Sequence, residues 1–418
     1  MLKLIRGATL IDCTGAGPVP DSAVLVDGDK IVQVGKAEAV CVTTQDVQVF
    51  DACGLTLIPG LIDSHVHITG SGDPNPLKRL KELVPHATLR SAHHAKATVE
   101  AGFTTIRDAG GPYLIDVALR DAINEGLVPG PRMRVACHGL SITGGHGDPL
   151  NGFPPEITFH GRHVVDSPDE ARRSAREQLR DGADHIKVCA TGGVLSEGDA
   201  PTARGMTVEE MRAAIEEAKN VGKKSMAHAQ GSTGIMNAIV AGIDSVEHGC
   251  YLTDEIIDEM LKRGVWLVPT LCAPHHIIKH GLQGGIPEYG VRKTEALYKR
   301  HVESFATALK AGVKIAMGTD AATPFNFHGR NAIELELMVQ AGMSPMAALV
   351  ATTRMGAELI GIEDKVGTVE TGKLADLVLV DGDPLADVKV LQELGKIRLV
   401  MKGGAVVVDR GVKVCVGE

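Results

Sequence analysis

The stretch PGLIDSHVH at residues 59–67 is a short apolar run that ends in two histidines, His65 and His67. In a β-strand, residues i and i+2 point to the same face, so the two imidazoles converge on one point. This arrangement suits a divalent metal ion, whose bonds to histidine nitrogen are about 2.0–2.1 Å long. Because the chain has 17 histidines, one such pair arises readily by chance, and the motif gains meaning only from its surroundings.

Seven further apolar runs follow this stretch along the chain. They are GFTTIRDAG (102–110), RMRVACHG (132–139), ADHIKVCATGG (183–193), KKSMAHAQG (223–231), IDSVEHGC (243–250), VWLVPTL (265–271) and VKIAMGTDA (313–321). Amphipathic segments with helix-start signals lie between several runs, such as Ser167 three residues before Glu170 and Thr207 three residues before Glu210.

The alternation of strands and helices predicts a parallel sheet. Eight such units over about 250 residues or more are typical of a closed barrel. We therefore predict an α/β fold with a (β/α)8 TIM-type barrel over residues 59–362. The alternative, an open doubly wound sheet that binds a dinucleotide, lacks a GxGxxG motif after its first strand.

The two ends of the chain differ from the middle and are similar to each other. Residues 1–58 and 363–418 contain short alternating or apolar runs separated by DG turns, which indicate β-strands. We expect both ends to combine into one small, discontinuous β-sandwich domain.

Composition and charge exclude several classes of protein. The chain has 418 residues, a net charge of −9, and only 7 Phe, 4 Tyr and 1 Trp, which argues against a nucleic-acid partner. No stretch of 18 apolar residues is present, so we expect no membrane span, and we see no secretion signal. The 8 cysteines form no CxxC motif, and we expect reduced thiols and a cytoplasmic location.

Three more residues of ligand type stand at the ends of apolar runs. His228 ends KKSMAHA, His248 ends IDSVEH, and Asp320 ends VKIAMGTD. Any one of these residues alone is explained by packing. Because the carboxyl ends of barrel strands converge, their combination with His65 and His67 points to a metal site.

Lys187 lies in the middle of an apolar run, where a buried and unpaired ammonium group is costly. A salt bridge or an extended stem that reaches solvent is one explanation. The other is carbamylation by CO₂, which converts the amine into an anionic group able to bridge two cations; desolvation lowers the pKa of the amine and favours this reaction.

This set of residues resembles the amidohydrolase superfamily over nearly the whole chain. The stretches PGLIDSHVH, HIKVCATGG, MAHAQG and SVEHG are similar to the imidazolonepropionase-like branch, which includes Xaa-Pro dipeptidases and related dipeptide carboxypeptidases. The resemblance implies a binuclear zinc site bridged by carbamylated Lys187 and a hydroxide. It assigns His65, His67 and Asp320 to the more buried metal, and His228 and His248 to the more exposed one.

The resemblance also implies a mechanism in which the bridging hydroxide attacks an amide carbonyl group. Asp320 would accept the hydroxide proton and pass it to the leaving amine. Four residues are candidates for substrate binding: His138, Ser141, His146 and Arg204. His138 is also a candidate catalytic residue that polarises the scissile carbonyl. For His138 a supporting hydrogen-bond role stays open, and for Arg204 a solvated surface position stays open beside pairing with a substrate carboxylate.

Two long polar segments, Gly144 to His163 and Cys272 to Gly290, follow predicted strands, and we expect both to be loops on the catalytic face. The predicted function is hydrolysis of an amide C–N bond, with an Xaa-Pro or Xaa-hydrophobic dipeptide as the substrate. Cyclic amides and N-acyl amino acids stay open as substrates. A non-catalytic barrel relative or a nucleic-acid deaminase fits the sequence less well, and the resemblance suggests a homo-oligomer.

Overall fold

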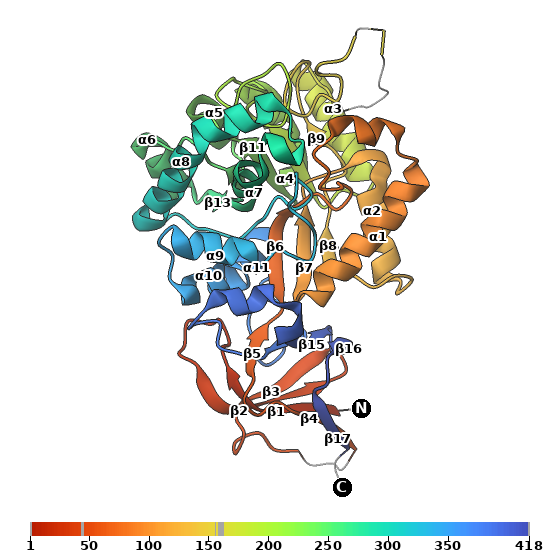
Figure 1. The fold of residues 1–418 in the computed structure, drawn as a ribbon, viewed down its shortest axis with the longest axis vertical. Coiled ribbons are helices and arrows are strands. Elements are labelled where there is room, and N and C mark those ends of the chain that lie inside the picture. The colour runs from red at the N-terminus through yellow and green to blue at the C-terminus, as the bar shows by residue number, and fades with distance from the viewer. Residues whose placement is uncertain (1, 43–45, 155, 158–162, 417–418) are drawn as a thin grey trace.

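The computed structural model describes residues 2–42, 46–154, 156–157 and 163–416. The molecule is elongated, with parallel strands surrounded by helices in one part and a separate sheet in the other (Figure 1). Both chain ends lie in the part that holds this separate sheet. None of the helices within the described residues is long and apolar enough to cross a membrane.

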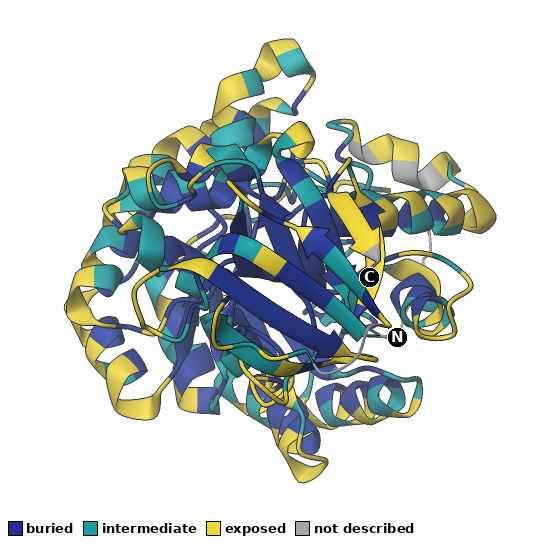
Figure 2. Ribbon diagram, turned by 90° about the horizontal axis from the view of Figure 1, so that it is seen from below, coloured by how far each residue is buried: buried dark blue, intermediate teal, exposed yellow. Residues whose placement is uncertain are grey.

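Seven of the eight predicted runs contain parallel strands, which form two sheets. The first sheet has the order β6 (Leu61–Val66), β7 (Phe103–Asp108) and β8 (Arg132–Arg134). The second has the order β13 (Trp266–Val268), β12 (Ser245–His248), β11 (Lys224–Ala229), β10 (His185–Cys189) and β9 (Gly139–Leu140). Every residue of β6, β7 and β10 is buried, as expected for parallel strands covered on both faces. Figure 2 shows buried residues in the interior and exposed residues on the outer faces of the surrounding helices.

The eighth run, residues 313–321, lies between the two sheets without being a regular strand. Ile315 forms a parallel bridge with Leu267 of β13, and Ala321 forms one with Val66 of β6. The Asp320 amide donates to the carbonyl oxygen of His65 at 2.7 Å. The end of this run therefore lies directly beside the end of β6.

Eleven α-helices occur in the described residues and cover the parallel strands (Figure 1). They are α1 (Val84–Glu100), α2 (Ile115–Asn124), α3 (Pro168–Arg180), α4 (Val208–Asn220), α5 (Ser232–Ala241), α6 (Asp254–Arg263), α7 (Cys272–His280), α8 (Glu288–Ala311), α9 (Ile333–Gln340), α10 (Pro345–Ala351) and α11 (Arg354–Ile360). Thr207 and Glu210 form the complete capping box expected at the start of α4. At α3, Ser167 accepts from the Glu170 amide, but the Glu170 carboxylate accepts from the Asp166 amide instead.

The prediction of a loop at Cys272 to Gly290 is wrong. The segment contains α7 and the first turn of α8. Helix α7 begins four residues after the end of β13, where a buried carboxylate accepts two backbone hydrogen bonds. The Glu334 carboxylate accepts from the backbone amides of Leu271 and Cys272 at 2.8 and 2.7 Å. Of the other predicted loop, residues 155 and 158–162 lie outside the described residues, and its described remainder has neither helix nor strand.

The separate sheet is built from both ends of the chain and has nine strands. Its main path runs β16-β15-β14-β5-β1-β2-β3, and β4 pairs with both β1 and β17. The strands are β1 (Leu2–Leu10), β2 (Val19–Asp27), β3 (Lys30–Lys36), β4 (Val47–Asp51), β5 (Thr56–Pro59), β14 (Leu377–Val380), β15 (Ile397–Lys402), β16 (Ala405–Asp409) and β17 (Lys413–Val416). The division at residues 58 and 363, and its description as a sandwich, stay predictions.

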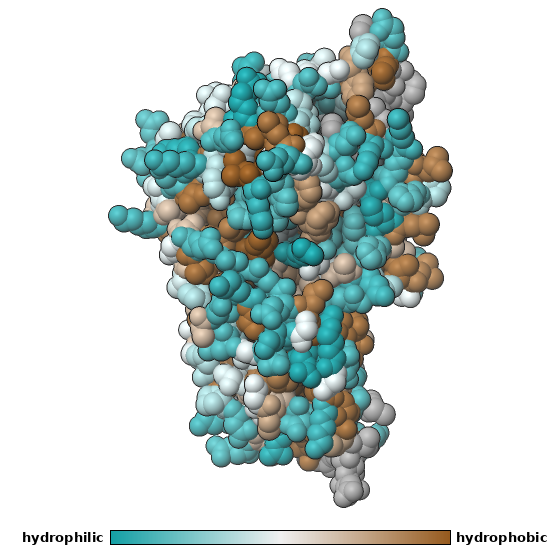
Figure 3. All heavy atoms as spheres, in the orientation of Figure 1, coloured by the Kyte–Doolittle hydropathy of each residue, from teal (hydrophilic) through white to brown (hydrophobic). Residues whose placement is uncertain are grey.

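The face of the molecule drawn in Figure 3 carries hydrophobic residues scattered among hydrophilic ones. Several large apolar side chains are exposed, including Leu83, Leu89 and Leu127. Single exposed apolar residues of this kind are normal on a protein surface and assign no binding function.

Asp63 of β6 ties the first parallel strand to the eighth run. Its fully buried carboxylate accepts from the Thr319 amide at 3.1 Å, from the Thr319 hydroxyl at 2.6 Å and from the Asn331 side chain at 2.7 Å. Burial raises the pKa of Asp63 to about 6, although these bonds oppose the rise.

We predict that Asp63→Ala lowers the free energy of unfolding by about 3 kcal/mol or more, because it leaves buried donors on Thr319 and Asn331 without an acceptor. Urea-induced unfolding measures the change. Asp258→Ala, at an exposed position of α6, is the matched control and should unfold like the wild type. Equal midpoints for all three proteins would show that this tie does not stabilise the fold.

Candidate active site

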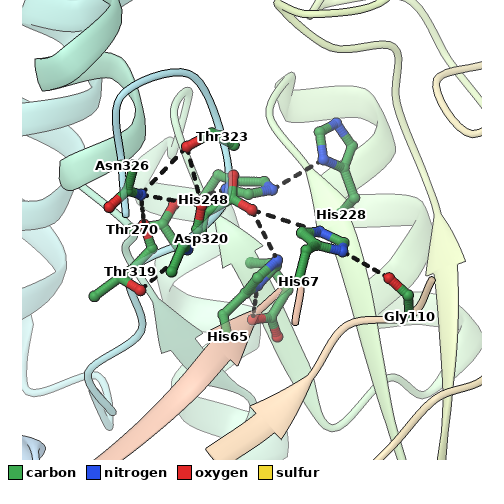
Figure 4. Close-up of polar contacts among 12 residues, drawn as sticks. His65, His67, Gly110, His228, His248, Thr270, Thr319, Asp320, Thr323 and Asn326 are labelled. Carbon is green, nitrogen blue, oxygen red and sulfur yellow. Dashed lines mark hydrogen bonds and ion pairs between the residues drawn. The ribbon is translucent and has the colours of Figure 1, made fainter. Parts of the chain in front are cut away.

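The predicted ligand residues come together where the parallel strands end (Figure 4). The ligand atoms of His65, His248 and Asp320 all lie within 4.8 Å of one another. Asp320 Oδ1 is 3.5 Å from Nε2 of His65 and 3.5 Å from Nε2 of His67. His228 Nδ1 lies 2.9 Å from His248 Nε2. The five side chains therefore form one cluster of nitrogen and oxygen atoms.

His65 of β6 and His67, directly after that strand, are each anchored through the Nδ1 atom. His65 Nδ1 contacts the Glu247 carboxylate at 2.7 Å, and His67 Nδ1 contacts the carbonyl oxygen of Gly110 at 2.8 Å. Because both acceptors require a proton on Nδ1, Nε2 of each ring keeps its lone pair and faces Asp320.

The two histidines of β11 and β12 each have an outer contact of the same kind. His248 Nδ1 contacts the Thr270 hydroxyl at 2.7 Å, and His228 Nε2 contacts the carbonyl oxygen of Gly192 at 3.0 Å. The remaining nitrogens, Nε2 of His248 and Nδ1 of His228, then face each other. Metal-binding histidines in proteins nearly always have such an outer hydrogen bond, which sets the tautomer and the ring orientation.

Burial sets the protonation of this cluster. It lowers the pKa of His65, His228 and His248 well below the usual value for histidine, which keeps the imidazoles neutral, as a metal ligand requires. Burial also raises the pKa of Asp320 to about 6, although Lys187 opposes the rise.

Lys187 extends from β10 into the same interior and is 4% exposed. Its amine has no hydrogen-bond or ion-pair partner among the described residues, which removes the salt bridge as an explanation for its burial. Burial lowers the pKa of the amine, and the charges of Glu247 and Asp320 oppose the change. A desolvated amine of this kind is the form that reacts with CO₂.

Two residues of the site were missed by the sequence analysis, Arg107 of β7 and Glu247 of β12. The Arg107 guanidinium donates to both Glu247 oxygens at 3.0 and 3.1 Å and to the Ser64 carbonyl oxygen at 2.6 Å. Both side chains are at most 2% exposed. The signal that could have found them is the one that marked Lys187, a charged residue inside an apolar strand.

The backbone is strained at two residues of the cluster and at Thr270, which contacts His248. His248, Thr270 and Asp320 have φ values of 71°, 53° and 56°. Positive φ values cost free energy in residues other than glycine and are concentrated at functional sites. Here they turn ligand-type side chains at the point where each strand or run ends.

The four predicted substrate contacts lie in different surroundings. His146 stacks on the His228 ring with centroids 4.0 Å apart, so it lies beside the cluster. His138 is partly buried and stacks on His163 at 5.2 Å. Ser141 is buried and accepts from the Gly147 amide at 3.1 Å, which supports the loop. Arg204 has an exposed side chain.

Known proteins similar to this chain define its family. The sequence profile of the amidohydrolase family matches residues 56–407, and the chain belongs to this family. It is therefore a hydrolase. The family is typically metal-dependent, and His65, His248 and Asp320 form a group of donors that could hold an ion.

The relatives differ in their activities. Ochratoxinase from Aspergillus niger is 34% identical over 85% of this chain and 76% of its own length. Imidazolonepropionase from Symbiobacterium thermophilum is 27% identical over 97% of this chain and 94% of its own length. The crystal structure of an Xaa-Pro dipeptidase with bound methionine has a TM-score of 0.91 at 34% identity and covers 97% of this chain and 99% of that one.

We predict that Glu247→Gln lowers the affinity of the site for zinc about 10–100-fold, because His65 loses the carboxylate that fixes its orientation and tautomer. Competition with a chromophoric chelator measures the affinity. Glu255→Gln, at an exposed position of α6, is the control and should bind zinc like the wild type. Unchanged affinity in both variants would contradict the anchoring role of Glu247.

Proposed function

We propose that the protein is a binuclear, metal-dependent amidohydrolase that cleaves the C–N bond of Xaa-Pro or Xaa-hydrophobic dipeptides. The observation that carries the proposal is the shared anchoring of the four histidines, each with one nitrogen bound outward and the other facing the cluster. We further infer that the two parallel sheets and residues 313–321 close into one (β/α)8 barrel, because that run bridges both β13 and β6.

The donor set fits metal ions, and zinc is our choice. Four ligands arranged tetrahedrally at about 2.0–2.1 Å lie about 3.3 Å from one another. The distances between the facing donor atoms are 2.9 and 3.5 Å. His65, His67 and Asp320 would hold one ion, and His228 and His248 the other. A carbamate on Lys187, formed from CO₂ and the neutral amine with loss of a proton, would lie between them.

When bound, the ions would supply an acidified water molecule as the nucleophile and polarise the substrate carbonyl group. The chain itself supplies the proton transfers. Asp320 accepts a proton from the nucleophile and returns it to the leaving amine, which makes it base and then acid. The Asn326 side-chain amide and the Thr323 hydroxyl donate to the Asp320 carbonyl oxygen at 3.0 and 2.9 Å and hold its backbone in the strained conformation.

Substrate recognition depends on residues other than the metal ligands. We propose that His138 contacts the scissile carbonyl group, that His146 lines the substrate pocket, and that Ser141 shapes the pocket through its loop. Arg204, with its exposed side chain, would pair with a free carboxylate at the entrance. The similarity to an Xaa-Pro dipeptidase structure supports a dipeptide, whereas the similarity to imidazolonepropionase supports a cyclic amide as the second candidate.

Several expectations about the protein in the cell stay predictions. They are a cytoplasmic location, a homo-oligomeric state, and a small-molecule or dipeptide partner in place of nucleic acid.

We predict that zinc-loaded enzyme hydrolyses Xaa-Pro dipeptides and that Asp320→Asn lowers kcat about 10²–10⁴-fold, because general acid–base catalysis contributes a factor of this size. Release of free proline from a dipeptide panel measures the rate. Asp364→Asn, at an exposed position, is the control. A rate near the wild-type value in Asp320→Asn would contradict the proton-transfer role. Turnover of a cyclic amide but no dipeptide would favour the second candidate.

A further inference from the structure

A chain of buried polar side chains connects α8 to His146. Lys293 of α8 forms an ion pair with Asp199, with 2.9 Å between Nζ and Oδ1. The Ser196 hydroxyl donates to Asp199 at 2.7 Å, and His146 Nδ1 lies 2.9 Å from the same Ser196 oxygen. The side chains of Lys293 and Asp199 are 12% and 7% exposed. Only His146 was singled out from the sequence.

The Lys293 ammonium group donates all three of its protons to residues 193–199, the segment that follows β10. Besides Asp199, it donates to the carbonyl oxygens of Gly193 at 3.0 Å and Ser196 at 2.7 Å. Beneath it, Val194 and Leu195 pack on a small apolar cluster that includes Ile286 and Val291. The segment that follows β10 is therefore fastened to the start of α8 by both polar and apolar contacts.

The direction of the hydrogen bonds fixes the tautomer of His146. A serine hydroxyl has one proton, and its shortest, charge-assisted acceptor here is the Asp199 carboxylate. The Ser196 oxygen must then accept, so Nδ1 of His146 carries the ring proton. This network leaves Nε2 of the neutral ring without a proton, as a hydrogen-bond acceptor.

The His146 ring is also held sterically. One face stacks on His228 with ring planes 15° apart, and a Cβ atom added to Gly193 would lie 2.2 Å from His146 Nδ1. Among the described residues, Nε2 has no hydrogen-bond partner of its own. A fixed acceptor atom beside the cluster is therefore available to a ligand.

We propose that Lys293, Asp199 and Ser196 are positioning residues that hold His146 as an acceptor for an N–H group of the substrate. In the dipeptide of the proposed function, on which this inference rests, that group is the α-ammonium of the first residue. His146 then sets specificity for substrates with a free amine, and it does not donate to the carbonyl oxygen.

The kinetic test compares an Xaa-Pro dipeptide with its analogue that has hydrogen in place of the α-amine. Lys293→Met should raise KM for the amine-bearing dipeptide about tenfold, the size expected for a lost hydrogen bond to a charged group, and change KM for the analogue less than twofold. Lys299→Met, on the same helix and 91% exposed, is the control. Equal losses for both substrates, or no loss for either, would overturn the proposal.

A second measurement needs no substrate. In zinc-loaded protein labelled with ¹⁵N-histidine, the His146 signals, assigned by their loss in His146→Gln, should show the Nδ1–H tautomer. Lys293→Met should convert them to a mixture of tautomers. An Nε2–H tautomer in the wild type would overturn the inference. If the wild type hydrolyses neither the dipeptide nor its analogue, the proposed function fails. The tautomer of His146 alone then decides whether Lys293, Asp199 and Ser196 position this ring as an acceptor.

Discussion

The buried ion pair between Arg107 and Glu247 holds the centre of the site in place. The Glu247 carboxylate is fully buried, which is costly for a charged group unless a cation and further hydrogen bonds compensate it. Arg107 supplies the positive charge, and the Ser245 hydroxyl and His65 Nδ1 form the further hydrogen bonds to the Glu247 carboxylate. Because the same guanidinium also binds the Ser64 carbonyl oxygen, the orientation of His65 and the end of β6 depend on one interaction.

The site is built from features that each cost stability. Lys187 is buried without a partner among the described residues, Asp320 and His248 have positive φ values, and the neutral imidazoles crowd together. Native structures keep such features where function requires them and compensate for them elsewhere. Here the compensation includes Asp63, which joins β6 to residues 313–321, and Glu334, which starts α7 beside Thr270.

The elements that follow a local pattern could be predicted from the sequence. The apolar runs that end at His65, His228 and His248 are strands, and periodicity placed Lys187 in the interior. The eighth run, which ends at Asp320, is less regular, since only isolated bridges connect it to its neighbours. The predicted loop after β13 is helical because of Glu334, whose carboxylate comes from a segment more than sixty residues away in the chain.

Contacts between distant segments could not be predicted. His146 and Lys293 are linked through Asp199 and Ser196, and no spacing in the sequence shows that a lysine of α8 reaches this loop. Glu247 directly precedes His248, which the sequence pattern indicated, but its role depends on Arg107, 140 positions earlier in the chain. Substrate contacts also come from segments that are distant in the chain. The metal ligands, which stand at the ends of apolar runs, could therefore be predicted from the sequence, whereas the substrate could not.

The most direct test of the central claim is elemental analysis of protein purified with bicarbonate and without chelators. The proposed site, with two groups of donors bridged by a carbamate on Lys187, predicts about two equivalents of divalent metal per chain. It also predicts that Lys187→Ala retains less metal than the wild type. A folded wild-type protein that binds no metal, or that binds a single equivalent unaffected by Lys187→Ala, would contradict the account.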